Sequence, residues 1–106
     1  MTVDRFMEME LGGSITLKGF GELGGGELVV VKKLVGRYAR KVTDAAKGYE
    51  SLTVTMKPVH KTKTGEKYEI HAMLVIDGKK LTSEVVDMNL FVALDSTLQH
   101  VLAEQK

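Results

Sequence analysis

Residues 67–86 read KYEIHAMLVIDGKKLTSEVV, and this stretch decides how the chain folds. In its first half every second residue is apolar, which is the pattern of a half-buried β-strand. Asp77 and Gly78 follow, and an Asp-Gly pair between such runs is the strongest short signal for a two-residue hairpin. The stretch therefore predicts two antiparallel strands, residues 67–76 and 79–86.

The same two periodicities predict the other elements. Alternation of apolar residues predicts a strand over residues 14–18 that extends toward Phe20, and another over 52–59. Pro58 cannot donate a ladder hydrogen bond, so it belongs at an edge or a bulge. Residues 60–66 are expected to form a polar connection. Apolar residues at helical spacing predict one helix over residues 27–46 and a last helix that begins near Asp87 or Asn89 and runs to the chain end.

The predicted order is β-α-β-β-β-α. Two amphipathic helices can cover one face of a four-stranded sheet and leave the other face open, so the fold class is an α+β two-layer sandwich. A chain of 106 residues allows one domain, which we place at residues 14–106. Residues 1–13 form either an N-terminal arm or a strand extension, and the sequence does not decide between them.

Composition excludes several classes of protein. The chain has no cysteine, so disulfides and thiolate metal sites are excluded. The first residues, MTVDRFMEMELGG, mix acids with apolar residues and do not form a signal peptide. No apolar run approaches the roughly 20 residues of a membrane span. We therefore expect a cytoplasmic protein with no membrane partner, and a net charge of +1 argues neither for nor against a polyanionic one.

GFGELGGG, residues 19–26, has the spacing of a dinucleotide-binding fingerprint. A dinucleotide fold also needs a larger parallel sheet, whereas the strands that follow here form an antiparallel meander. Glycines that permit a sharp turn between a strand and a helix explain the loop more simply. A weaker functional alternative is that backbone N–H groups at the helix start contact an RNA phosphate.

No catalytic or metal-binding pattern is present in the sequence. His60, His71 and His100 form no His-x-His or His-x-x-x-His pair, so we expect no metal and no cofactor. The serines lack the context of a nucleophile, and capping or surface roles explain Asp87 and Asp95. We therefore expect that the protein is not an enzyme.

The basic residues gather in three groups, one on the outer side of the first helix and two at hairpins. The groups are Lys33, Arg37, Arg40 and Lys41; then Lys57, His60, Lys61, Lys63 and Lys67; then Lys79 and Lys80. One interpretation is a solvated helix face with hairpins kept soluble by lysine. The other is a surface for the phosphate backbone of a nucleic acid. Base stacking is not supported, because the aromatic residues fit core or strand positions.

Three stretches together resemble the ribosome hibernation-promoting factor family, also called protein Y or ribosome-associated inhibitor A. DMNLFVALDSTLQHVLAEQ, residues 87–105, is similar to the opening of the family's last helix, with an Asp, then an aromatic residue, Ala, an aliphatic residue and Asp. SITLKGFGEL resembles its first strand and loop, and EKYEIHAMLVIDGKKLTSEVVD its third and fourth strands. The resemblance spans roughly residues 14–105 and implies a layout like that of double-stranded-RNA-binding domains.

The resemblance also implies a function. Members of the family bind the small ribosomal subunit near the decoding centre, block translation and protect idle ribosomes under stress, mainly through basic side chains on ribosomal RNA phosphates. It therefore implies an RNA-binding, non-catalytic translation regulator with no DNA partner. The RNA-binding residues expected here are Lys33, Arg37, Arg40, Lys41, Lys57, Lys61, Lys63, Lys79 and Lys80.

The last helix departs from the family, whose members carry many Lys and Arg there. Here Lys106 is the only Lys or Arg among residues 87–106. This implies a divergent member of the family with a different footprint on the ribosome. The alternative function is a protein-interaction module of the same fold. That module would form a homodimer through the open sheet face or the strand edge at Pro58.

Overall fold

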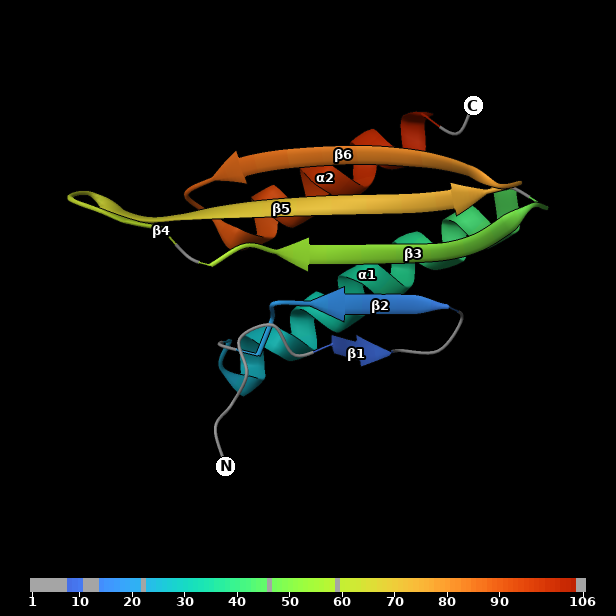
Figure 1. Cartoon of the computed structure of the whole chain (residues 1–106). Coiled ribbons are helices and arrows are strands. Elements are labelled where there is room, and N and C mark those ends of the chain that lie inside the picture. The colour runs from blue at the N-terminus through green and yellow to red at the C-terminus, as the bar shows by residue number, and fades with distance from the viewer. Residues whose placement is uncertain (1–7, 11–13, 22, 46, 59, 105–106) are drawn as a thin grey trace.

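The structure is a computed structural model that describes residues 8–10, 14–21, 23–45, 47–58 and 60–104. The elements are β1 (Glu8–Glu10), β2 (Ile15–Lys18), α1 (Gly25–Ala45), β3 (Tyr49–Met56), β4 (His60–Thr62), β5 (Gly65–Ile76), β6 (Lys79–Asp87) and α2 (Leu90–Glu104). Each predicted strand and helix is present. Both helices lie on one face of the sheet, so the predicted α+β two-layer class is confirmed (Figure 1).

The sheet contains one parallel pair of strands, β2 and β3, which α1 connects (Figure 1). The other pairs are antiparallel: β1 with β2, β3 with β5, β4 with β5, and β6 with β5. Residues 8–10 thus extend the sheet beyond the four predicted strands, and the rest of the N-terminal segment 1–13 lies outside the described residues. This arrangement lacks the larger parallel sheet that a dinucleotide-binding fold requires.

The polar connection predicted over residues 60–66 contains a strand that the sequence did not predict. His60–Thr62 forms β4, which pairs with the first residues of β5 and makes a two-stranded arm beyond the main sheet (Figure 1). Met56 pairs with Ile70 and His60 with Lys67, so one strand advances four residues while the other advances three. Pro58 lies between the two ladders and belongs to neither, which suits a residue that has no N–H to donate.

Two turns depend on backbone conformations that favour particular residues. Asp77 and Gly78 have φ of 51° and 76°, as a type I′ hairpin requires, so the predicted turn between β5 and β6 is confirmed. Gly19, at the end of β2, has φ of +81°, and a Cβ there would collide with the backbone carbonyl of Met56. This glycine therefore allows β2 to end against β3 before the chain enters α1.

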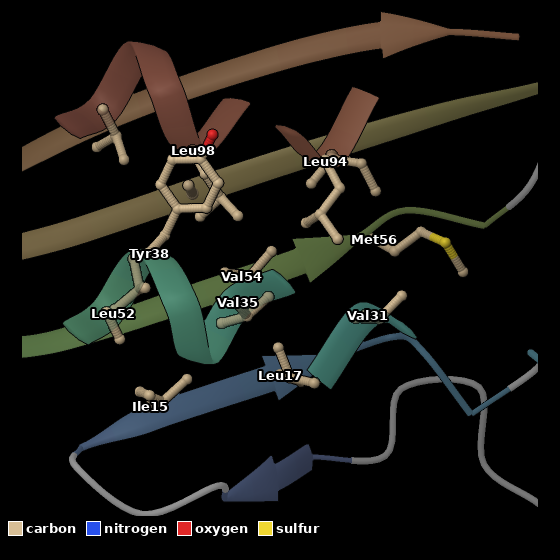
Figure 2. Packing of buried hydrophobic residues seen from close by; sticks show 14 of the residues in the cluster. Ile15, Leu17, Val31, Val35, Tyr38, Leu52, Val54, Met56, Leu94 and Leu98 are labelled. Carbon is tan, nitrogen blue, oxygen red and sulfur yellow. The ribbon is translucent and has the colours of Figure 1, made fainter. Parts of the chain in front are cut away.

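The core lies between the sheet and the two helices (Figure 2). α1 contributes Val31 and Val35, and α2 contributes Leu94 and Leu98, each at most 1% exposed. The facing strands supply fully buried side chains of their own, namely Leu17, Leu52, Val54, Met56, Ile70 and Leu74. Burying each such side chain contributes roughly 1.5–3 kcal/mol, so this single core accounts for both amphipathic stripes in the sequence.

The start of α2 is fixed by two short side chains. The Oδ1 of Asn89 accepts hydrogen bonds from the N–H groups of Phe91, at 2.9 Å, and Val92, at 3.1 Å. The Oδ1 of Asp87 accepts one from the Asn89 N–H at 2.8 Å. Asn89 is therefore the N-cap, one of the two residues that the sequence offered for this role.

Candidate nucleic-acid interface and a polar cluster on the open sheet face

The outer side of α1 carries a row of exposed basic side chains. Lys33, Arg37 and Arg40 lie opposite the buried stripe of Val31, Val35 and Val42, as the helical period predicts. Lys41 flanks them, with its Nζ 5.1 Å from the centroid of the Tyr38 ring. We call the five basic residues on the outer side of α1 and on its two flanks the α1 basic side, namely Lys32, Lys33, Arg37, Arg40 and Lys41.

The charges of the α1 basic side are not cancelled by neighbouring acids. α1 contains two acidic residues, Glu27 and Asp44, against five basic ones. Within the described ranges, no carboxylate lies within ion-pair distance of these five cations. Lys32, which the sequence analysis left out, is exposed as well. Helix faces that are merely solvated often hold Glu–Lys pairs one turn apart, and such pairs are not formed here.

The turn between β5 and β6 adds two further predicted residues close to the C-terminal end of α1. Lys79 and Lys80 are both exposed. The N–H of Asp77 donates a 2.9 Å hydrogen bond to the carbonyl oxygen of Gly48, just beyond the helix. Two acidic residues, Asp77 and Glu50, lie at the same end of the molecule as these lysines. The N–H of Gly78 donates a hydrogen bond to the Oε2 of Glu50 at 2.5 Å.

The remaining predicted residues lie at the other end of β5, with Lys57 directly after β3 and Lys61 and Lys63 on the β4–β5 arm (Figure 1). Lys57, Lys61 and Lys63 are exposed, and so is Lys67. β5 has 12 residues, which span roughly 37 Å at the usual rise of a strand. The nine predicted RNA-binding residues therefore do not form one compact patch. The structure separates the arm from the lysines of the β5–β6 turn by the full length of the sheet.

α2 presents a different surface. Residues 90–104 contain no Lys or Arg, and Asp95 points toward α1. The Tyr38 hydroxyl donates a 2.6 Å hydrogen bond to Oδ1 of Asp95, and the Gln99 amide donates to Oδ2 at 2.7 Å. Burial raises the pKa of Tyr38 above 10.0, and the bond to Asp95 raises it further. The bond between Tyr38 and Asp95 joins the two helices. All Lys and Arg residues of the two helices belong to α1.

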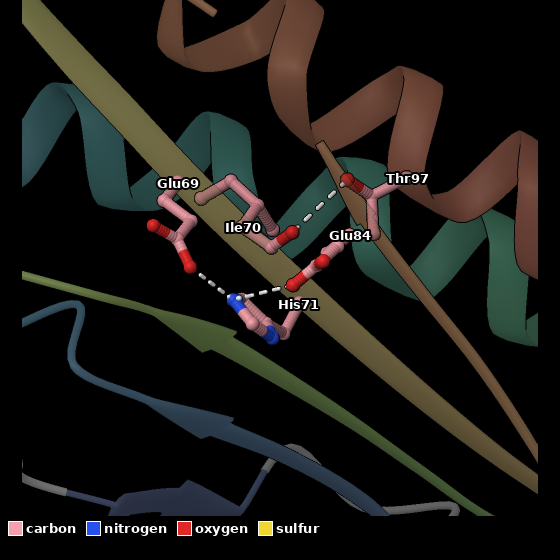
Figure 3. A network of polar contacts seen from close by, with 5 residues as sticks. All are labelled: Glu69, Ile70, His71, Glu84 and Thr97. Carbon is pink, nitrogen blue, oxygen red and sulfur yellow. Dashed lines mark hydrogen bonds and ion pairs between the residues drawn. The ribbon is translucent and has the colours of Figure 1, made fainter. Parts of the chain in front are cut away.

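A polar cluster that the sequence analysis missed lies on the open face of the sheet. Glu69 and His71 are two residues apart on β5, and Glu84 is the cross-strand partner of His71 on β6. The Nε2 of His71 lies 2.5 Å from Oε2 of Glu69 and 3.3 Å from Oε2 of Glu84 (Figure 3). His71 lies within the strand predicted over residues 67–76, and the two carboxylates beside it were not anticipated.

The loop before α1 and the aromatic residues are also placed. A Cβ on Gly25 or Gly26 would meet no atom within 4 Å, so these positions are open to the surroundings. Phe20 and Tyr38 are buried, as expected of core residues. The other aromatic residues singled out in the sequence, Tyr49, Tyr68 and Phe91, are partly buried and pack against the core.

Comparison with models of known protein families and with curated proteins finds no match to this chain. Neither α1 nor α2 is long and apolar enough over its described residues to cross a membrane. The class of this protein is therefore stated from its structure alone. The protein is an α+β sandwich with one β-α-β unit, an antiparallel β5–β6 hairpin and one strongly basic helix.

Proposed function

We propose that this protein is a ribosome-associated translation inhibitor that binds small-subunit ribosomal RNA in the cytoplasm without catalysing a reaction. The observation that carries the proposal is the α1 basic side. Five exposed cations on one helix, without ion-pair partners in the described structure, suit a partner with the negative charge of a phosphate backbone. The resemblance of the sequence to the hibernation-promoting factors supports the same function.

The mechanism is occupancy of an RNA channel. Lys and Arg that contact phosphates release condensed counterions, so binding weakens steeply as salt rises. Arg37 and Arg40 can hold phosphate oxygens with two parallel N–H groups, which the lysines cannot do. Lys79 and Lys80 offer a separate contact at the β5–β6 turn, where Lys80 stands on the open face of the sheet because it pairs with Val75. The β4–β5 arm, with Lys61 and Lys63, and Lys57 beside its base reach a second RNA segment at the opposite end of the sheet.

The test is co-sedimentation of the purified protein with small ribosomal subunits across a salt series. The wild type should pellet at low salt and be released as salt rises. In the variant K33A/R37A/R40A, pelleting should be lost at the salt where half of the wild type is bound. Loss of three phosphate contacts should also lower the slope of log affinity against log salt by roughly 2 to 3.

The matched control places the same change of charge on the other helix. V92E/H100E/A103E alters three exposed positions of α2 and shifts the formal net charge by the same amount. This control should pellet like the wild type, because its charges lie away from the α1 basic side. Equal loss in both variants would show a response to net charge alone and would overturn the assignment to α1.

A homodimer is the second candidate, and the free edge of β6 favours it. In the described structure β6 pairs with β5 alone. If β6 strands from two copies align antiparallel over their full length, Lys79 of each faces Asp87 of the other. Opposite charges at such positions stabilise a strand pair. Lys79→Glu should then lower the mass measured by light scattering after size exclusion, whereas Lys63→Glu on the arm should not.

A further inference from the structure

The cluster of Glu69, His71 and Glu84 has an excess of negative charge that its own contacts do not balance. Two ionised carboxylates bring two negative charges, and one imidazole brings at most one positive charge. Both carboxylates approach the same nitrogen, Nε2, which carries at most one hydrogen and so can donate fully to only one of them. The geometry therefore leaves room for a further cation.

The nearest lysines along the two strands of the cluster do not fill this role. Lys67 stands two residues before Glu69 on β5, and Lys80 stands four residues before Glu84 on β6. No ion pair joins either lysine to the cluster in the described part of the chain.

The donor atoms are arranged as a divalent transition metal requires. One donor atom from each of the three residues lies within 4.8 Å of the others. Zn²⁺ binds imidazole nitrogen and carboxylate oxygen at about 2.0–2.2 Å, which places tetrahedral ligands roughly 3.4 Å apart. The 3.3 Å between His71 and Glu84 matches this spacing. The closer Glu69 side chain is 43% exposed, so it can rotate outward to the same distance.

The scaffold beneath the cluster is rigid. His71 and Glu84 are direct partners in the β5–β6 ladder, and cross-strand partners keep their Cβ atoms about 4.5–5.5 Å apart. On the other side of β5, the buried Thr97 hydroxyl lies 2.8 Å from the Ala93 carbonyl oxygen and 3.4 Å from that of Ile70 (Figure 3). β5 is thereby held against α2, and the ligands need little reorganisation to converge.

We propose that Glu69, His71 and Glu84 bind one divalent cation of the zinc type on the open face of the sheet. Three protein ligands leave a fourth position of a tetrahedral ion open to water. A shallow depression lined by His71, Thr82, Ser83 and Glu84 gives solvent access to that position. The site lies on the sheet face opposite α1, so it does not depend on the α1 basic side.

The experiment is a calorimetric titration of the full chain with Zn²⁺, repeated with Mg²⁺. The wild type should bind Zn²⁺ saturably with one-to-one stoichiometry, and Mg²⁺ should not compete, because an imidazole ligand selects Zn²⁺ over Mg²⁺. His71→Gln should weaken Zn²⁺ binding at least about tenfold, since even losing an outer-shell partner costs that much. His100→Gln, an exposed histidine on α2, is the matched control and should bind like the wild type.

Glu84→Gln keeps the test decisive if His71→Gln perturbs folding. The Glu84 side chain is 69% exposed, so its loss removes a ligand without disturbing the core. The circular dichroism and melting temperature of each metal-free variant confirm that it folds. Unsaturable Zn²⁺ binding by the wild type, equal affinity in both histidine variants, or full competition by Mg²⁺ would each overturn the site and leave a hydrogen-bonded cluster only.

Discussion

The two helices cover the same face of the same sheet, yet their outer sides differ. Both bury an apolar stripe, from Val31 to Val42 in α1 and from Leu90 to Val101 in α2. α1 exposes five basic residues, whereas residues 90–104 contain none. Because outward-facing residues contribute little to packing, the fold leaves their charge free to vary. This difference between the helices is why the proposed RNA contact is assigned to α1 and not to α2.

The largest expected effect concerns what the helices share, their buried sides. Leu98→Ala removes a side chain that is 1% exposed, and the cavity should lower the free energy of unfolding by about 2–5 kcal/mol. Urea denaturation measures this change. The control is Lys33→Ala on the outer side of α1, which should stay within about 0.5 kcal/mol of the wild type. Similar losses for both would contradict the division into core and surface sides.

The next largest effect on stability concerns the loop through which the chain enters α1. Gly19→Ala forces a Cβ onto the Met56 carbonyl at a φ of +81°. We therefore expect the free energy of unfolding to fall by more than about 1–3 kcal/mol. Gly25→Ala, at the first residue of α1, meets no atom within 4 Å and should stabilise the protein by up to about 1 kcal/mol. Thermal unfolding of the two variants should thus shift in opposite directions. A shift in the same direction would show that the loop is not positioned by Gly19.

α2 is entered through a polar cap, and its loss should have a smaller effect. Asn89→Ala leaves the N–H groups of Phe91 and Val92 without their acceptor, which should cost about 1 kcal/mol. Asn89→Asp keeps an acceptor at the same place and serves as the control. Chemical denaturation of the two variants tests whether an acceptor oxygen on the side chain of residue 89 fixes the start of α2. Equal stability of Asn89→Ala and Asn89→Asp would show that it does not.

The sequence predicts most of the fold because two periodicities and one turn specify it. Alternation before Asp77 fixes the face that Ile70, Ala72 and Leu74 bury, and the Asp-Gly turn fixes the register. β4 escaped prediction, since the residues His60-Lys61-Thr62 show no apolar alternation and are paired through the backbone with β5. β1 has the same difficulty, because it comprises three residues in a stretch whose order the sequence left open.

The two candidate sites also differ in how far the sequence predicted them. The 100° spacing of a helix correctly predicts which side Lys33, Arg37 and Arg40 occupy, while their contact with RNA stays a prediction. The cluster on the open face was missed because the search for metal ligands followed spacing along the chain. The hairpin register itself held the signal, since a two-residue turn at 77–78 pairs His71 with Glu84. Combining register with residue chemistry would have found it.

The smallest expected effect tests the contact that joins the two helices. Tyr38→Phe removes the hydroxyl that donates to Asp95 and should lower the free energy of unfolding by roughly 1 kcal/mol at neutral pH. Burial and Asp95 raise the pKa of Tyr38 above 10.0, so the folded state favours the neutral phenol. This stabilisation is complete below pH 10 and is lost as the pH rises through the folded-state pKa.

The gap in stability between the wild type and Tyr38→Phe should therefore close above pH 10. Tyr49 and Tyr68 also have raised pKa values, so the stability of both proteins falls in this range, and the comparison isolates Tyr38. Urea denaturation from pH 7 to 11 follows the gap. A constant gap would contradict the raised pKa of Tyr38, and the absence of a gap at neutral pH would mean that the helices are held together by their apolar sides without help from Asp95.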